Sequence, residues 1–318
     1  MSSSETLDAF AAVRREIAKA VVGQEQAVTG VLIGLLTEGH ILLEGVPGTA
    51  KTLLVRSLAR ALTADFRRVQ FTPDLMPGDL TGTLIYHADS SHFEFREGPV
   101  FTNILLADEI NRTGPKTQAA LLEAMAERQV SVDGKAHKLP DPFMVVATQN
   151  PIEFEGTYTL PEAQLDRFEL KIVVPLPNAE QELEMLERHA THFDPTRLET
   201  ANIEAVASPA TIVQARSEVR AVTIHHEILD YIVRLVHATR EHPATAIGAS
   251  PRGATALLAV SRALAWLEGR DYVTPDDVKA LAIPALAHRI TLLPEAELDG
   301  LNAPSLVSSI LGSVAAPR

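Results

Sequence analysis

A glycine-rich turn between an apolar strand and a helical repeat is the stretch best suited to chemistry. The turn consists of Gly45, Val46, Pro47, Gly48, Thr49, Ala50, Lys51 and Thr52. Backbone N–H groups of such a turn point at phosphate oxygens, and the dipole of the following helix favours the same anion. The lysine adds a charge on the outer phosphates, and the Thr52 hydroxyl can hold Mg²⁺. We predict a phosphate-binding loop, with an ordinary strand–turn–helix corner as the alternative.

The residue before the lysine departs from the usual phosphate loop, which has glycine at this position. Ala50 stands there instead. An alanine can open a right-handed helix without strain, so we expect the departure to weaken the match only slightly.

Acidic and amide side chains follow two further apolar strands. Residues 103–107 read as a strand buried on both faces of a parallel sheet, and Asp108 and Glu109 come directly after it. In enzymes that cleave nucleotides, one acid holds Mg²⁺ and another polarises the attacking water. Asn150 ends the next such strand, where open α/β sheets bind ligands, and is placed to orient a water or a phosphate. An Asn-Pro turn opener is an equally sound reading.

The elements that position these residues are those of a layered α/β domain. Apolar spacing predicts helices over about 6–20, 25–36, 54–62 and 116–127, and strands over 41–43, 68–71, 103–107, 143–148 and 169–174. Turn-prone residues between alternating strands predict two β-hairpins, over 83–96 and 129–139. Residues 72–79 contain prolines and a glycine and are predicted to form a loop.

Beyond Pro177 the chain reads as all-helical. We therefore predict two domains, residues 1–177 and 178–318, with Asn178 capping the first helix of the second. Arg252 stands in the first turn of a predicted helix, where the dipole opposes a positive charge, so a phosphate or an acidic side chain is expected nearby. Arg167 lies at a corner after residues 160–166, and by itself it reads as a surface arginine.

Composition restricts the class of protein. The 318 residues are 46% hydrophobic and 22% charged, which is typical of a globular protein with room for two cores. A formal charge of −13 argues against a protein built mainly to neutralise nucleic-acid phosphate. The absence of cysteine excludes disulfides and thiolate chemistry. A polar N-terminal start and the lack of a long apolar run predict a cytoplasmic protein without membrane insertion.

These motifs, in this order, resemble the AAA+ ATPases and, within them, the MoxR family. The residues that carry the resemblance are GVPGTAKT at 45–52, FTPDLMPGDLTG at 71–82, FEFREGPVF at 93–101, LADEINR at 106–112, ERQVSVDG at 127–134, ATQNP at 147–151, EGTYTLPEAQLDRF at 155–168 and GASPR at 248–252. Together they span nearly the whole chain. Alanine before the lysine is itself common among MoxR-like proteins.

The resemblance implies a P-loop NTPase fold: a parallel five-stranded sheet core with two β-hairpin inserts, followed by an all-helical lid. It also implies ATP and Mg²⁺ as ligands. Lys51 and Thr52 would contact phosphate and Mg²⁺, with Leu53 and the rest of the loop at the nucleotide. Asp108 would hold Mg²⁺, through water, and Glu109 would activate the attacking water.

The resemblance assigns the remaining site residues as well. Asn150 would be the first sensor, and Arg252 the second, acting from the lid. Arg167 would be the arginine finger that reaches a neighbouring subunit's nucleotide. Val22 and Gly23 would lie against the adenine.

The implied function is ATP-driven, chaperone-like remodelling or maturation of client protein complexes by a homo-oligomer, a hexameric ring. Proteins of this family frequently act beside proteins with von Willebrand factor A domains. The alternative is a nucleic-acid-acting AAA+ motor or transcription activator, which the acidic balance and the lack of a recognition helix disfavour. A nucleotide-gated scaffold without turnover is disfavoured by the presence of both Glu109 and Arg167.

Overall fold

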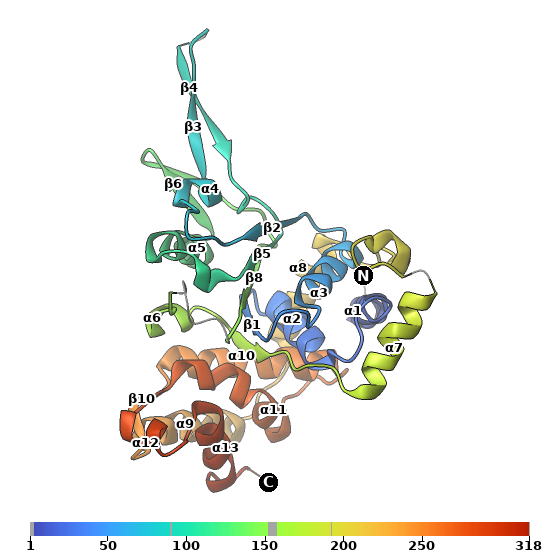
Figure 1. Ribbon diagram of the computed structural model, residues 1–318. Coiled ribbons are helices and arrows are strands. Elements are labelled where there is room, and N and C mark those ends of the chain that lie inside the picture. The colour runs from blue at the N-terminus through green and yellow to red at the C-terminus, as the bar shows by residue number, and fades with distance from the viewer. Residues whose placement is uncertain (1–2, 90, 152–157, 192, 318) are drawn as a thin grey trace.

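A parallel five-stranded sheet lies at the centre of the protein, which we describe from a computed structural model (Figure 1). The structure describes residues 3–89, 91–151, 158–191 and 193–317. The strands are β1 (Ile41–Glu44), β2 (Phe66–Gln70), β5 (Ile104–Asp108), β8 (Met144–Gln149) and β9 (Leu170–Val173). They lie in the order β2-β5-β8-β1-β9, and every pairing is parallel. The predicted five-stranded core is therefore confirmed.

Side chains alternate between two hydrophobic cores, one on each face of the sheet. Ile104 of β5 and Met144 of β8 belong to one core, and their neighbours Leu105 and Val145 belong to the other. All four side chains are fully or almost fully buried. Strands buried on both faces read as continuous apolar runs, which is why the sequence identified them.

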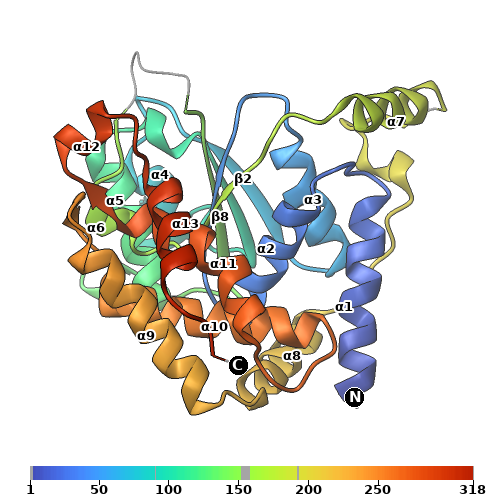
Figure 2. The same cartoon turned by 90° about the horizontal axis from the view of Figure 1, so that it is seen from below.

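Helices cover both faces of the sheet (Figures 1 and 2). One core is covered by α1 (Ser3–Ala18), α2 (Glu25–Leu36), α3 (Lys51–Ala61) and α8 (Pro209–Ala221). The other core is covered by α5 (Pro115–Glu127). The short 3-10 helices η1 (Ile110–Arg112) and η2 (Leu198–Ala201) lie in the connections.

Both predicted hairpins form two-stranded sheets outside the central one. They are β3 (Gly82–His87) with β4 (His92–Glu97), and β6 (Gln129–Val132) with β7 (Lys135–Lys138). The first projects away from the body of the protein (Figure 1). The loop predicted over 72–79 is wrong at its end, where α4 (Pro77–Thr81) begins. Proline suits the first position of a helix, and the Asp79 carboxylate accepts a hydrogen bond from the Met76 N–H at 2.8 Å.

The C-terminal part is mostly helical. It contains α7 (Ala179–Ala190), α9 (His226–Glu241), α10 (Pro251–Leu267), α11 (Pro275–Leu286), η3 (Ala287–Arg289), α12 (Pro294–Leu298) and α13 (Ala303–Ser313). The expectation of an all-helical lid needs one correction, because β10 (Thr245–Ile247) and β11 (Thr291–Leu292) form an antiparallel pair. Strands this short, with partners distant in sequence, leave no periodic signal. The predicted short helix before Arg167 is α6 (Glu162–Leu165).

The predicted helix cap at Asn178 is confirmed. The Asn178 side chain accepts from the Gln181 N–H at 3.0 Å and opens α7, and Thr274 opens α11 in the same way. The domain boundary at Pro177 stays a prediction. Residues 155–157 of the expected motif over 155–168 lie outside the described residues. Within the part of the chain that the structure describes, no helix is long and apolar enough to cross a membrane.

A buried histidine at the start of β1 makes stability depend on pH. His40 Nε2 donates to the Met125 carbonyl at 3.1 Å, and Nδ1 accepts from the Val145 N–H at 2.9 Å. Burial lowers the pKa of His40 to about 4. Below about pH 6.5 the unfolded chain therefore takes up a proton that the folded chain excludes until about pH 4.

We predict that the free energy of unfolding falls as pH is lowered from about 6.5 to about 4, by up to roughly 3 kcal/mol from His40 alone. Urea unfolding at several pH values measures this slope. His40→Gln removes the titrating group and keeps one donor and one acceptor, so its slope should be shallower. Equal slopes for the two proteins would contradict the assignment.

Candidate nucleotide site

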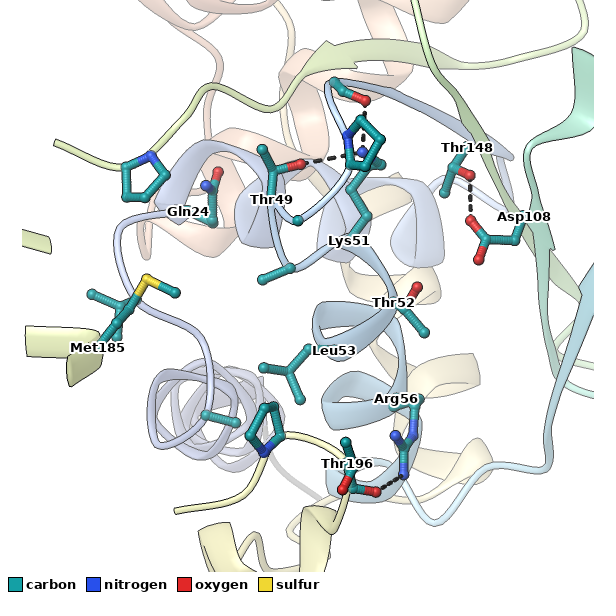
Figure 3. A pocket seen from close by; sticks show the side chains of 18 of the residues that line it. Gln24, Thr49, Lys51, Thr52, Leu53, Arg56, Asp108, Thr148, Met185 and Thr196 are labelled. Carbon is teal, nitrogen blue, oxygen red and sulfur yellow. Dashed lines mark hydrogen bonds between the residues drawn. The ribbon is translucent and has the colours of Figure 1, made fainter. Parts of the chain in front are cut away.

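A cavity of about 540 Å³ opens where β1, β5 and β8 end (Figure 3). The predicted site residues that line it are Val22, Gly45, Pro47, Gly48, Thr49, Ala50, Lys51, Thr52, Leu53, Asp108, Glu109 and Asn150. Apart from Val22, which lies between α1 and α2, they come from three strand ends, the loop after β1 and the N-terminus of α3. The structure thus brings together the residues that the sequence assigned to phosphate, metal and water.

The Lys51 ammonium is held by the loop that precedes it. Its Nζ donates to the carbonyls of Gly45 at 2.7 Å and Val46 at 2.8 Å, and to Thr49 Oγ1 at 3.2 Å. Burial lowers the pKa of Lys51, while Asp108 and Glu109 act in the opposite direction. The loop therefore places one lysine charge over a concave backbone, as phosphate binding requires.

The expectation for Ala50 is wrong in its geometry. Ala50 has φ 61° and ψ 18°, which is the left-handed region, and it precedes α3 as its N-cap instead of opening the helix in a right-handed conformation. A non-glycine residue in this region costs roughly 1 kcal/mol or more, which explains why most phosphate loops use glycine here. Gly48, at φ +88°, supplies the other left-handed position of the loop.

The Asp108 carboxylate lies between a cation and a hydroxyl. Arg68 Nη2 donates to Asp108 Oδ2 at 2.7 Å and Arg68 Nε donates to the same oxygen at 3.0 Å. Thr148 Oγ1 donates to Asp108 Oδ1 at 2.6 Å and accepts from the Glu109 N–H at 2.8 Å. One hydroxyl on β8 therefore fixes the positions of both acids at the end of β5.

Glu109 is directed by two further side chains. Its Oε2 accepts from Gln70 Nε2 at 2.6 Å and from Arg112 Nη1 at 3.1 Å. Glu109 itself has φ 57°, so a left-handed residue turns the chain sharply after β5. Neither Arg68 nor Gln70 was predicted, because nothing in the sequence of an edge strand marks which of its residues face the site.

The donor set fits a nucleotide with a magnesium ion. The Thr52 hydroxyl and the Asp108 carboxylate are the hard oxygen ligands that Mg²⁺ prefers, and both line the cavity beside Lys51. Asp108 already holds the Arg68 guanidinium, which indicates an anionic group set to bind a cation. The cavity volume also lies in the range of small-molecule sites.

The cavity is also lined by residues that the sequence did not reveal. Those that line it are Gln24, Arg56, Met185, Arg188, His189, Phe193, Pro195 and Thr196. Most of them belong to α7 and the segment after it. In the sequence, only the predicted cap of α7 indicated where these residues lie. Of the predicted adenine contacts, Val22 lines the cavity and Gly23 does not. Gly23 has φ +70°, which favours glycine, and a Cβ there would also lie 2.2 Å from the end of the Gln181 side chain of α7.

The two predicted arginines lie elsewhere. Arg167 and Arg252 line a second cavity, of about 340 Å³, and neither lines the first. Other residues of the second cavity include His40, Asp166, Glu169 and Arg289. Within one chain, therefore, the structure separates the phosphate-loop residues from both arginines.

Comparisons with known proteins agree with this architecture. The family model described as ATPase family associated with various cellular activities (AAA) matches residues 40–170, and that of the AAA lid domain matches residues 237–310. Chaperone MoxR1 of Mycobacterium tuberculosis is 43% identical, over 95% of this chain and 81% of the relative. Protein MoxR of Methylorubrum extorquens is 35% identical, over 98% of this chain and 96% of the relative. The chain belongs to the MoxR family of AAA+ ATPases.

A solved structure extends the agreement from sequence to fold. The crystal structure of a candidate ATPase from Cytophaga hutchinsonii is 43% identical to this MoxR-family protein and superposes with a TM-score of 0.91, over 99% of this chain and 97% of the other. The resemblance predicted from the motifs is thereby confirmed. A nucleic-acid motor is not favoured by these relatives.

We predict that Thr148→Val lowers the free energy of unfolding by about 1–3 kcal/mol, because it leaves Asp108 Oδ1 and the Glu109 N–H without their shared partner. Thr148→Ser keeps the hydroxyl and serves as the control. Denaturant unfolding of the two variants measures the difference. A loss in Thr148→Ser as large as that in Thr148→Val would contradict the assignment to the hydrogen bonds, because serine keeps the hydroxyl that makes them.

Proposed function

We propose that this protein is a magnesium-dependent ATPase that acts as a ring, hexameric by its family resemblance, and remodels client proteins in the manner of a chaperone. The observation that carries the proposal is the division of the site. The phosphate loop and the acids line one cavity, and the arginines line another. In such a subunit, the first cavity would bind the subunit's own nucleotide, and the arginines of the second would complete the site of a neighbouring subunit.

The first cavity supplies nucleotide binding. The backbone of residues 45–50 and the Lys51 ammonium would bind the outer phosphates, and Val22 and Leu53 would contact the nucleoside. Thr52 and, through water, Asp108 would hold Mg²⁺, which neutralises phosphate charge when bound. These assignments are supported by the fact that all of these residues except Val46 line one cavity.

Hydrolysis needs a group that polarises water and a group that orients it. Glu109 would accept the proton of the attacking water as the P–O bond to the leaving ADP breaks. Asn150, 7% exposed at the end of β8, would orient that water or the terminal phosphate. The Thr148 hydroxyl holds both the Glu109 backbone and one oxygen of Asp108, the acid that would hold Mg²⁺.

Charge on the transferred phosphoryl group would be stabilised from the neighbouring subunit. Arg167 acts as the finger, and Arg252 as the second sensor of the lid. In related systems an arginine finger supplied by another protein raises the rate on the order of 10³ to 10⁵. A single subunit is therefore expected to hydrolyse ATP poorly.

The two β-hairpin inserts would contact the client protein and act on it. Tyr86 and Phe93, 54% and 65% exposed, pack with their ring centroids 5.1 Å apart on the projecting β3–β4 hairpin, and apolar side chains that project in this way suit contact with another protein. The relative from Mycobacterium tuberculosis is named a chaperone. A partner with a von Willebrand factor A domain and a cytoplasmic location are part of the proposal, and binding to nucleic acid is not.

The roles of Lys51 and Glu109 can be separated. Lys51→Ala should lose ATP binding, because it removes the charge on the outer phosphates. Glu109→Gln should bind ATP yet turn over little, because an amide cannot accept the proton. A fluorescent nucleotide titration and a phosphate-release assay measure the two properties. Equal loss of binding in both variants would contradict this division of roles.

Mixing of inactive subunits tests the shared site. Arg167→Ala subunits should be inactive alone but regain hydrolysis when mixed with Lys51→Ala subunits, since each kind supplies what the other lacks. The readout is phosphate release across a series of mixing ratios, with the total protein concentration held constant. A series in which mixing restores nothing would remove the support for a finger that acts in trans.

A further inference from the structure

The segment that carries Arg167 is tied to the lid by one buried guanidinium. Arg289, at the end of η3, donates from Nε to Asp166 Oδ1 at 2.7 Å. Its Nη2 donates to the Phe168 carbonyl at 2.8 Å and to the Asp166 carbonyl at 3.3 Å, and its Nη1 donates to the Glu169 carbonyl at 3.3 Å. Residues on both sides of Arg167 are thus held by a single side chain from a different part of the chain.

The Asp166 carboxylate also reaches the start of α10. Ser250 Oγ donates to Asp166 Oδ2 at 3.3 Å and accepts from the Arg252 N–H at 3.2 Å as the cap of that helix. Asp166 therefore precedes Arg167 in sequence and is joined to Arg252 through one hydroxyl. One of its oxygens accepts from Arg289, and the other is joined through Ser250 to the backbone of Arg252, which lines the second cavity together with Arg167.

This connection is more buried than the residues that it connects. The side chain of Arg289 is 3% exposed and that of Asp166 is 19% exposed, whereas Arg167 and Arg252 are exposed residues. The Arg167 guanidinium donates to the Leu122 carbonyl at 2.6 Å. Two exposed arginines thus lie beside a buried network of hydrogen bonds.

Stability alone gives a weak reason for such a pair. The desolvation of two charges offsets much of their attraction, so a buried ion pair contributes little net stability compared with apolar packing. What a pair of this kind does supply is a fixed geometry, because each donor of Arg289 meets one acceptor at a defined position. The Ala285 carbonyl accepts another of its N–H groups and anchors it to α11.

We propose that Asp166, clamped by Arg289 and Ser250, is a positioning residue that holds Arg167 and Arg252 as one unit directed at the neighbouring subunit's phosphates. This inference rests on the proposed function, in which Arg167 acts in trans. Movement of the lid would then move both arginines together, because the same carboxylate joins their supports.

The test separates what a subunit gives to its neighbour from what it receives. Asp166→Asn keeps the size of the side chain but removes the charge that orients Arg289. The variant ring should lose turnover on the order of 10²-fold, as misplaced catalytic groups do, with the KM for ATP unchanged. Its own phosphate loop stays intact, so Asp166→Asn subunits should regain hydrolysis when mixed with Lys51→Ala subunits. They should regain none with Arg167→Ala subunits, because neither kind then supplies a placed finger.

If Asp166→Asn only damaged the structure of the subunit, other measurements would change. Poor nucleotide binding, loss of assembly on sedimentation, or failure to recover with Lys51→Ala subunits would overturn the proposal, as would full activity of the Asp166→Asn ring. Asp277→Asn is the matched control, because Asp277 forms another largely buried lid pair, with Arg270, away from the second cavity. It should be less stable in thermal unfolding but keep its hydrolysis, both alone and when mixed with either partner.

A second variant keeps the test independent of the buried charge. Ser250→Gly removes the hydroxyl between Asp166 and Arg252, and glycine remains an acceptable helix cap. It should show the same pattern of recovery with a smaller loss of turnover. If Arg167→Ala itself is not rescued by Lys51→Ala, the proposed function fails. If Arg167→Ala is rescued and Asp166→Asn recovers with both partners, only the positioning role fails.

Discussion

A sheet buried on both faces can carry polar chemistry only at its ends, and this constraint organises the protein. The interior positions of β1, β5 and β8 are apolar because no water reaches them to solvate a charge. Polar side chains are therefore confined to the residues at which the strands stop. Since the strands are parallel, they stop at the same edge, and the loop lysine, the acids and Asn150 meet there without being close in sequence.

The charges at this edge are held in place before any ligand arrives. Lys51 rests on loop carbonyls, Asp108 on Arg68, and Glu109 on Gln70 and Arg112. Each ionised group thus has partners in a partly buried environment, where an unpaired charge would be costly. In the proposed site, a triphosphate and its metal would replace some of these hydrogen-bond partners. Binding would then be coupled to a shift of β2 and of the residues after β5.

The separation of the arginines from the phosphate loop supports the proposal that a neighbouring subunit completes the site. The hydrogen bonds beside both arginines join the end of α6, η3 and the start of α10. The position of the arginines therefore depends on the packing of the C-terminal helices. Packing is discrete rather than continuously deformable. In the proposed ring, a change in the lid would therefore move both arginines together and so act on the neighbouring subunit's site.

The sequence by itself determined the five strands, the two hairpins, the phosphate loop, the acids and the family, because these features are written in local periodicity and in residues at fixed spacing. Tertiary structure alone decided the rest. The left-handed Ala50, the pairing of Arg68 with Asp108, the α7 side chains in the first cavity, the β10–β11 pair and the Arg289 clamp on Asp166 are such features. Each joins residues far apart in the chain or depends on how a turn closes. Such contacts are fixed by the geometry of packing, and no periodic pattern of residue types records that geometry.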